Sequence, residues 1–402
     1  MAKHTRELMG ELIQMSRYLL LCLLVQLISF TSTTLKVQAS ELHILHSLWG
    51  HDDFFERLTN DFNRLNSGTE LKFIYRNVHQ NEIHQHVSIL DTAAILMPSD
   101  KLGASMNYLT PLPKAWLPTS IAKTYIDTVR VSNLVYGVPI MSGNHLVMYY
   151  NKSLVDKPAS SWEELLQQAP IIREEGATPV GMPVHSPYYL ISFFSAFGGE
   201  VFDASGRPNL HSNENIEALN FFKSLYHKDL FLKGCDMRCG KEDFHAGKVA
   251  YSIDIDGAAR ENIKQLGNNL GVVFLPSYNG NMMRSFFSTL SLYLPYQQLT
   301  ESDQVALMRI IDFLSSADTQ QELATGHLLL PVHKSVERLV ATKSDDLLLT
   351  IYQQLQRSIP MPPTEAMHRI WIKMGELQLK FVKGELSAEE FLQRVQKYAT
   401  TD

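Results

Sequence analysis

Two polar side chains and a glycine, Ser142, Asn144 and Gly143, interrupt an apolar stretch between residues 134 and 152. Serine and asparagine offer hydrogen-bonding groups, and glycine lets a ligand or another chain approach the backbone closely. Residues 145–150 are rich in aromatic and branched side chains, which predicts a β-strand. We therefore expect residues 134–152 to pass from one lobe of the protein to a second, beside a ligand cleft.

The carboxylates of Asp254 and Asp256 raise the alternative of glycoside hydrolysis. That reaction needs two carboxyl groups about 5–9 Å apart across a bound sugar. Side chains two residues apart on one loop seldom face each other in that way. We expect these residues to cap a helix and, in one case, to hydrogen-bond a ligand hydroxyl. The motifs of serine hydrolases, zinc proteases and P-loop proteins are absent from the sequence.

Histidine and cysteine offer little to a metal ion. The densest histidine group is His79, His84 and His86, and the last two would point in different directions on a helix. Cys235 and Cys239 are the only cysteines beyond residue 39. In an oxidising compartment they would close a small disulfide loop, because a closed zinc site needs four ligands. We expect this disulfide, solvated histidines, no metal and no cofactor.

Aromatic residues fall at several predicted strand ends and lobe crossings. A sugar ring has an apolar face that stacks on aromatic rings and hydroxyls that need hydrogen bonds. Any one of these aromatics more often packs in a core, but the set favours a carbohydrate ligand. Its members are Trp49, Trp116, Tyr188, Tyr189, Tyr251, Phe286, Phe287 and Trp371.

Residues 1–39 have the pattern of an export signal. Lys3, Arg6 and Arg17 precede or flank an uncharged apolar run at 18–30, and small residues lead to a cleavage point after Ala39. The alternative is an uncleaved membrane anchor, for which the apolar run is short. Cys22 follows leucines rather than small residues, so we do not predict a lipoprotein.

The composition of the chain limits its class. The 402 residues carry a formal charge of -6, and this lack of a basic surplus argues against nucleic-acid binding. A charged fraction of 19% and a hydrophobic fraction of 45% are typical of a globular protein. The part beyond residue 39 is long enough for two lobes with cores of their own.

The predicted elements alternate along the chain. Strands at 41–48, 71–75 and 93–97, with helices at 54–65 and 82–90 between them, predict a mostly parallel sheet covered by helices. Ligands bind beyond the carboxyl ends of such strands, where Trp49 and His51 fall. The alternation resumes from residue 160, where Ser161 precedes an acidic first helical turn. Residues 286–293 have the same pattern as the first crossing, in which small polar residues interrupt an apolar stretch flanked by aromatic residues. We interpret them as the return crossing.

The C-terminal part is predicted to be helical. Helices are expected at 304–315 and 318–325, with Gly326 as the C-cap of the second. The tail from 364 to 398 is expected to break at Gly384 and to restart after Ser387, a capping residue. The chain shows no tandem repeat. These elements together predict an α/β protein.

Several short motifs, taken in order, resemble the extracellular solute-binding family of ABC importers, of the maltose-binding-protein-like type. They cover nearly all of the chain beyond residue 39. The motifs are Tyr136-Gly137-Val138-Pro139, Tyr149-Tyr150-Asn151-Lys152, Ser161-Trp162-Glu163-Glu164-Leu165, Phe244-His245-Ala246-Gly247-Lys248-Val249-Ala250, Phe313-Leu314, Thr325-Gly326-His327 and Leu330-Pro331-Val332-His333-Lys334-Ser335.

This resemblance implies two α/β lobes, each a mostly parallel sheet flanked by helices, which are joined by a hinge and close on a ligand. After the signal at 1–39, lobe I would hold 40–140 and 287–335. Lobe II and the C-terminal helices would hold 141–286 and 336–402. The resemblance also implies a periplasmic, non-enzymatic, monomeric protein that delivers its ligand to a membrane permease.

Within that family, His46-Ser47-Leu48-Trp49-Gly50 and the hinge resemble the glycerol-3-phosphate-binding branch. Where that branch places an arginine for the phosphate, this chain has Trp371. Arginine suits phosphate and tryptophan suits a sugar face, so we predict a neutral sugar or oligosaccharide. A glycerol-3-phosphate or glycerophosphodiester ligand is the alternative.

We expect the ligand contacts to come from both lobes, both crossings and the tail. Two alternatives to transport remain at this point. One is a secreted carbohydrate-active hydrolase that uses Asp254 or Asp256, and the other is a sensor partner that presents its ligand to a membrane kinase. The expected contacts are Trp49, His51, Ser142, Asn144, Tyr188, Asp254, Ser288 and Trp371.

Overall fold

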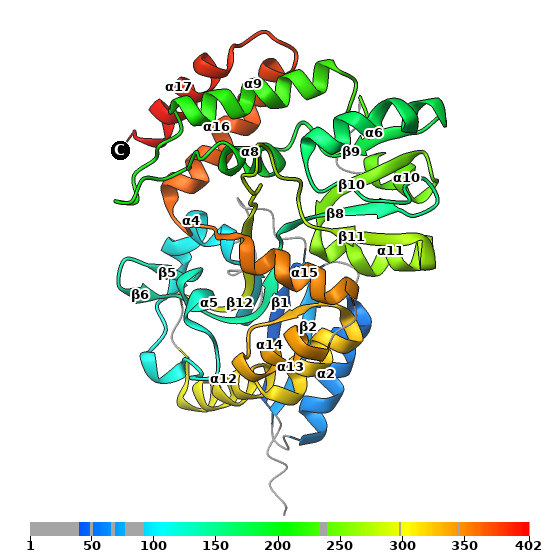
Figure 1. Ribbon diagram of the computed structural model, residues 1–402. Coiled ribbons are helices and arrows are strands. Elements are labelled where there is room, and N and C mark those ends of the chain that lie inside the picture. Colours follow the sequence, from blue (N-terminus) through cyan, green and yellow to red (C-terminus); the bar gives the residue numbers. More distant parts are fainter. Residues whose placement is uncertain are drawn as a thin grey trace, which may run out of the picture.

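Two separate β-sheets, each flanked by helices, form the two lobes of the protein (Figure 1). The computed structural model describes residues 40–48, 51–65, 69–76, 92–233, 239–296, 299–343 and 346–401. Trp49, Cys235, the histidines at 79, 84 and 86, and the predicted helix at 82–90 lie outside these residues. Of the described helices, none combines the length and apolar character needed to cross a bilayer.

The larger sheet belongs to the lower lobe in Figure 1. Its strand order is β13-β7-β12-β3-β1-β2, and the short strands β4 (Leu109–Thr110) and β14 (Ile359–Pro360) pair with β12. The main strands are β1 (Ser40–His46), β2 (Thr69–Tyr75), β3 (Thr92–Pro98), β7 (Gly137–Gly143), β12 (Phe286–Pro295) and β13 (Leu330–Pro331). The helices of this lobe include α2 (Asp52–Leu65), α12 (Glu301–Leu314), α13 (Ala317–His327) and α14 (Lys334–Lys343).

The smaller sheet belongs to the upper lobe. Its order is β11-β8-β10-β9, from the strands β11 (Leu270–Val273), β8 (Leu146–Asn151), β10 (Val249–Ile255) and β9 (Thr178–Gly181). Its helices include α6 (Trp162–Glu174), α9 (Asn213–His227), α10 (Cys239–His245), α11 (Ala259–Leu266), α16 (Glu365–Val382) and α17 (Ala388–Ala399). The two-lobed α/β architecture expected from the sequence is present.

Both sheets are mixed, which differs from the mostly parallel sheets expected. Strand β1 runs parallel to β2 and β3, and β9 runs parallel to β10. In contrast, β12 runs antiparallel to β3 and β7, and β8 runs antiparallel to β10 and β11. The antiparallel partners β12 and β8 are the strands that have just crossed from the other lobe. A chain that crosses enters its new sheet from the interlobe side, and this sets its direction.

The chain passes between the lobes at three places. The first passage joins β7 to β8, and the second joins β11 to β12. These are the two crossings predicted from residues 134–152 and 286–293. A third passage, implied at 335/336 by the lobe boundaries expected from the sequence, lies between α15 (Asp346–Arg357) and α16. Helix α14 contacts α13 and β13, while α15 contacts β8 and β11, so α15 lies between the lobes. The lobe boundaries given from the sequence stay a prediction.

Helix starts follow the local sequence. The Ser161 hydroxyl accepts a hydrogen bond from Glu164 N at the start of α6, and Ser387 and Glu390 form a capping box at the start of α17. The expected C-cap at Gly326 is wrong. Helix α13 continues to His327, and Leu328 takes the left-handed conformation at φ 56° as its cap.

We predict that Trp162→Ala lowers the free energy of unfolding by about 3–5 kcal/mol. Trp162 is fully buried at the start of α6 and stacks on Phe193 at 5.2 Å between ring centroids. Urea unfolding of both variants measures the effect, with Trp116→Ala as the matched control because Trp116 is only partly buried. Equal losses for the two variants would contradict a core role for Trp162.

Candidate functional site

The β7–β8 crossing brings together Asn144 and Ser288, two of the residues expected to contact the ligand. Asn144 is half-buried in the left-handed conformation at φ 53°, and its Nδ2 donates to Ser288 Oγ at 3.1 Å. Ser288 lies on β12, opposite Gly143 on β7, so the two crossings meet at this point. Asn144 is the most exposed residue of the 137–149 segment, which leaves part of its amide open to a ligand.

Ser142 is placed differently from its neighbour Asn144. It is buried on β7, and its hydroxyl is within hydrogen-bonding distance of Leu330 O at 3.4 Å and Pro331 O at 3.3 Å. Both carbonyls belong to β13 of the same lobe. This arrangement favours a role for Ser142 in holding β13, and its predicted ligand contact stays untested.

Tyr188 and Trp371 form an aromatic pair at the crossings. Tyr188 lies on the short helix α7 (Pro187–Leu190), and its hydroxyl donates to Asn144 O and, at 2.9 Å, to Phe286 O. The Trp371 ring on α16 lies 6.0 Å from the Tyr188 ring and meets the Phe286 ring edge-on at 6.3 Å. Burial raises the pKa of Tyr188 well above its usual value, with smaller contributions from Asp100 and Asp256, so the hydroxyl stays protonated.

Asp254 lies near the end of β10 and contacts Tyr189. The Tyr189 hydroxyl donates to Asp254 Oδ1 at 3.0 Å, and the backbone amide of Ile255 donates to the same oxygen at 2.7 Å. Asp254 lines a small pocket with Gly181, Lys241 and others from β9 and α10. Burial raises the pKa of Asp254 above its usual value. The remaining carboxylate oxygen is able to accept a ligand hydroxyl.

His51 lies at the start of α2, beside charged groups of both lobes. It is 8% exposed, and burial, followed by Arg260 and His327, lowers its pKa. The adjacent Asp53 makes a two-pronged ion pair with Arg260, with distances of 2.8 Å from Nη2 to Oδ2 and 3.3 Å from Nη1 to Oδ1. Asp53 belongs to α2 of the lower lobe and Arg260 to α11 of the upper lobe, so this pair joins the lobes.

Asp100 is a polar residue that the sequence analysis missed. It follows β3, and its Oδ1 is buried with no hydrogen-bond partner among the described residues. Burial raises the pKa of Asp100, opposed by Lys101, whose Nζ lies 3.8 Å from Asp100 Oδ2. The rule that ligands bind beyond the carboxyl ends of parallel strands pointed to this position as well as to His51.

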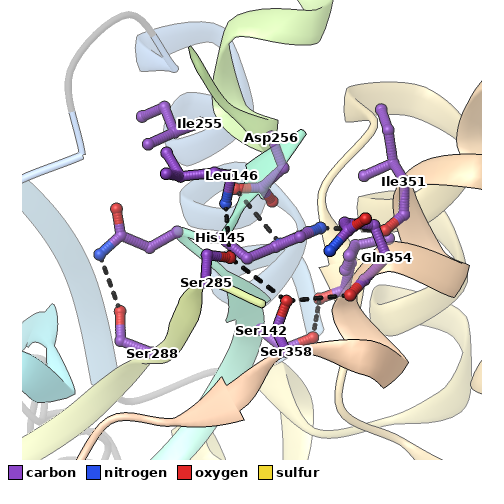
Figure 2. A network of polar contacts seen from close by, with 12 residues as sticks. Ser142, His145, Leu146, Ile255, Asp256, Ser285, Ser288, Ile351, Gln354 and Ser358 are labelled. Carbon is purple, nitrogen blue, oxygen red and sulfur yellow. Dashed lines mark hydrogen bonds and ion pairs between the residues drawn. The ribbon is translucent and has the colours of Figure 1, made fainter. Parts of the chain in front are cut away.

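A second missed group is a buried polar network under the first crossing (Figure 2). His145 Nε2 lies 2.9 Å from Ile351 O, and its Nδ1 lies 3.7 Å from Asp256 Oδ1. The Ser285 hydroxyl accepts a hydrogen bond from Leu146 N at 3.0 Å. Small polar residues near Gly143 gave a signal for a crossing, but nothing local indicated that Asp256 would lie against it.

The described residues offer no group of three histidine, cysteine, aspartate or glutamate side chains placed to hold a metal. Asp254 and Asp256 contact different partners, since Asp254 faces Tyr189 and Asp256 faces Gly143 and His145. The two side chains are thus held by separate partners.

Most of the chain matches the model of a known protein family. Residues 58–350 match the family model described as "Bacterial extracellular solute-binding protein". The chain belongs to this family. The match covers the β7–β8 and β11–β12 crossings, the whole smaller sheet and most of the larger one, so the fold and the family agree for this solute-binding protein.

Two individual relatives match parts of the chain at 25% and 28% sequence identity. A maltooligosaccharide ABC transporter solute-binding lipoprotein of Streptococcus pneumoniae is 25% identical over 271 residues, which are 63% of this chain and 62% of the relative. The chain thus matches about 62% of that relative's length. An arabinooligosaccharide-binding protein of Halalkalibacterium halodurans is 28% identical over 97 residues, 22% of each chain.

A solved structure shares the fold of this solute-binding protein. It is the maltose/maltodextrin-binding domain MalE from Bdellovibrio bacteriovorus bound to maltotriose, with a TM-score of 0.78. The comparison covers 89% of this chain and 98% of that one at 20% sequence identity. This likeness confirms the expected two-lobed fold.

We predict that the Asp53–Arg260 pair favours approach of the lobes by about 0.5–1 kcal/mol, as is usual for exposed ion pairs. Arg260→Ala and Asp53→Ala should each increase the radius of gyration of the ligand-free protein in small-angle scattering. The charge-swapped double variant Asp53→Arg, Arg260→Asp is the control and should restore compactness. Unchanged scattering in both single variants would contradict the prediction.

The same pair predicts a pH dependence. The hydrogen bond from Arg260 lowers the pKa of Asp53 to about 2, below its usual value of 3.8. Because the pKa is lowered in the paired state, the contribution of the pair is complete above pH 3.8 and disappears as the pH falls through about 2. Scattering of the wild type and of Asp53→Ala should therefore converge only near that pH, and convergence near pH 6 would contradict the assignment.

Proposed function

We propose that the protein is the substrate-binding component of an ABC importer and that it captures a neutral sugar or oligosaccharide between its lobes. The observation that carries this proposal is the Tyr188–Trp371 pair beside the polar groups of Asn144, Ser288 and Asp100. Two aromatic rings, tilted by 41° to each other, next to hydrogen-bonding groups match the apolar face and the hydroxyls of a sugar. The names of the oligosaccharide-binding relatives support the same ligand class.

The charges around the pair favour a neutral ligand over a phosphorylated one. The nearby cations already have carboxylate partners, since Arg369 Nη1 lies 2.9 Å from Glu365 Oε1 and Lys101 lies next to Asp100. A phosphate at this site would compete with those carboxylates. A glycerol-3-phosphate or glycerophosphodiester ligand is therefore the second candidate, supported by the presence of Lys101 near His368 on α16.

The proposed cycle uses the three passages between the lobes as a hinge. A ligand that contacts both lobes favours their approach, and the shift cannot exceed the difference between its affinities for the closed and open forms. A membrane permease would recognise the closed form. Export by a cleaved signal at 1–39, a periplasmic location and a monomeric state complete the proposal. The relatives are binding proteins of transporters, and this supports a function without turnover.

A thermal-shift screen tests the ligand class. We expect maltooligosaccharides or arabinooligosaccharides to raise the melting temperature, because a ligand that binds only the folded state stabilises it. Chromatography of the incubated sugar should find it unchanged. A shift by glycerol-3-phosphate or glycerophosphodiesters alone would support the second candidate, and release of shorter sugars would favour a hydrolase.

Trp371→Ala tests the aromatic surface. We expect the variant to bind the same sugar at least tenfold more weakly in calorimetry, a loss of about 1.4 kcal/mol, because the stacking face is removed. Trp116→Ala is the control, since Trp116 packs against the core of the lower lobe and should leave affinity unchanged. Equal affinity of Trp371→Ala and the wild type would exclude Trp371 as a sugar contact.

A further inference from the structure

Asp256 is a buried carboxyl group to which the proposed function gives no role. It follows β10 in the upper lobe, is 5% exposed and lies directly against the first crossing. A β-carbon at Gly143 would lie too close to Asp256 Oδ2 unless the carboxyl group moved, so glycine at this position keeps the carboxyl group against the crossing. Figure 2 shows Asp256 beside His145, under the turn that leads into Leu146.

Asp256 is tied to the crossing by its own backbone as well as by its side chain. Its amide donates to His145 O at 2.9 Å, and the Tyr149 hydroxyl donates to Asp256 O at 3.1 Å. The carboxyl group itself faces the turn, since its Oδ1 lies 3.7 Å from His145 Nδ1 and its Oδ2 lies against the backbone of Gly143. Burial raises the pKa of Asp256, and the nearby His145 and neighbouring backbone amides oppose this rise. The position of the carboxyl group is therefore fixed relative to the turn.

The turn itself has an unusual backbone that needs such support. Asn144 has φ 53° and Gly143 has φ 148°. A non-glycine residue in the left-handed region is disfavoured, although asparagine tolerates it better than most. This conformation goes with the hydrogen bond from Asn144 Nδ2 to Ser288 Oγ. Loss of the support would free Asn144 to adopt another conformation and lose that hydrogen bond.

We propose that Asp256 is a positioning residue for ligand binding: its carboxyl group holds the turn at 143–145 so that the Asn144 amide stays beside Ser288 and Tyr188. The proposal rests on the proposed function in that Asn144 is taken as a ligand contact. Asp256 itself does not touch the ligand, because Gly143 and His145 cover its carboxyl group.

A double-mutant cycle in maltotriose affinity tests this proposal. Asp256→Asn keeps the size of the side chain but replaces an acceptor oxygen with an amide that cannot accept hydrogen bonds. We expect Asp256→Asn to weaken binding at least tenfold in the wild-type background and less than threefold in the Asn144→Ala background, since it acts through Asn144. Equal losses in both backgrounds would overturn the proposal.

Asn215→Ala is the matched control for general destabilisation of the upper lobe. Asn215 lies near the start of α9 and is fully buried. Its Nδ2 lies 3.0–3.1 Å from the carbonyl oxygens of Glu200, Asn209 and Leu210 in the preceding loop. This variant should lower the melting temperature without changing maltotriose affinity. If it weakens binding as much as Asp256→Asn does, the effect comes from destabilisation and the proposal is wrong.

Hydrogen exchange of a peptide spanning residues 140–147 gives a readout that needs no ligand. We expect faster exchange at Asn144 and His145 in Asp256→Asn than in the wild type and in Asn215→Ala. Unchanged exchange would overturn the proposal even if affinity falls. If the wild type binds no maltotriose or other sugar, the proposed function fails alone, and this exchange measurement still decides whether Asp256 holds the turn.

Discussion

The structure depends on satisfying backbone polar groups where the chain passes between two buried lobe faces. Each passage carries N–H and C=O groups that have no neighbouring strand on one side, and such groups are costly when left unpaired. Side chains from other parts of the chain supply the partners. Ser285 Oγ accepts a hydrogen bond from Leu146 N, and Gln354 Oε1 of α15 accepts one from Leu275 N. The Tyr188 hydroxyl lies against main-chain carbonyls of two passages.

The need to pair these backbone groups with residues from distant parts of the chain explains which features the sequence could predict and which it could not. Strand and helix positions follow from local periodicity, and caps such as Ser161 and Ser387 follow from adjacent residues, so these were accessible. Asn144 and Ser288 could also be singled out, because small polar residues within apolar stretches are conspicuous, and their contact with a ligand stays a prediction. The burial of Ser142 against β13 and the position of Asp256 under Gly143 depend on residues far apart in sequence, and no local pattern encodes them. The mixed strand directions also depend on how distant parts of the chain pair, so no local pattern predicts them.

The aspartates near the passages fall into two groups. Burial raises the pKa of Asp100, Asp254 and Asp256, because a charge is costly away from water. The exposed Asp53 instead has a lowered pKa, because Arg260 of the other lobe donates a hydrogen bond to it. The charged pair between the lobes is thus at the surface, and the carboxyl groups nearer the crossings are buried.

The Tyr188 hydroxyl has a mechanical consequence. By donating to main-chain carbonyls of Asn144 and Phe286, it fastens together two chain passages that run in opposite directions. Two passages that bent independently would allow the lobes to twist as well as to open. With both carbonyls held against the same hydroxyl, we expect the two passages to move together at this point when the lobes approach or separate. A residue of the aromatic pair thus also connects the two passages mechanically.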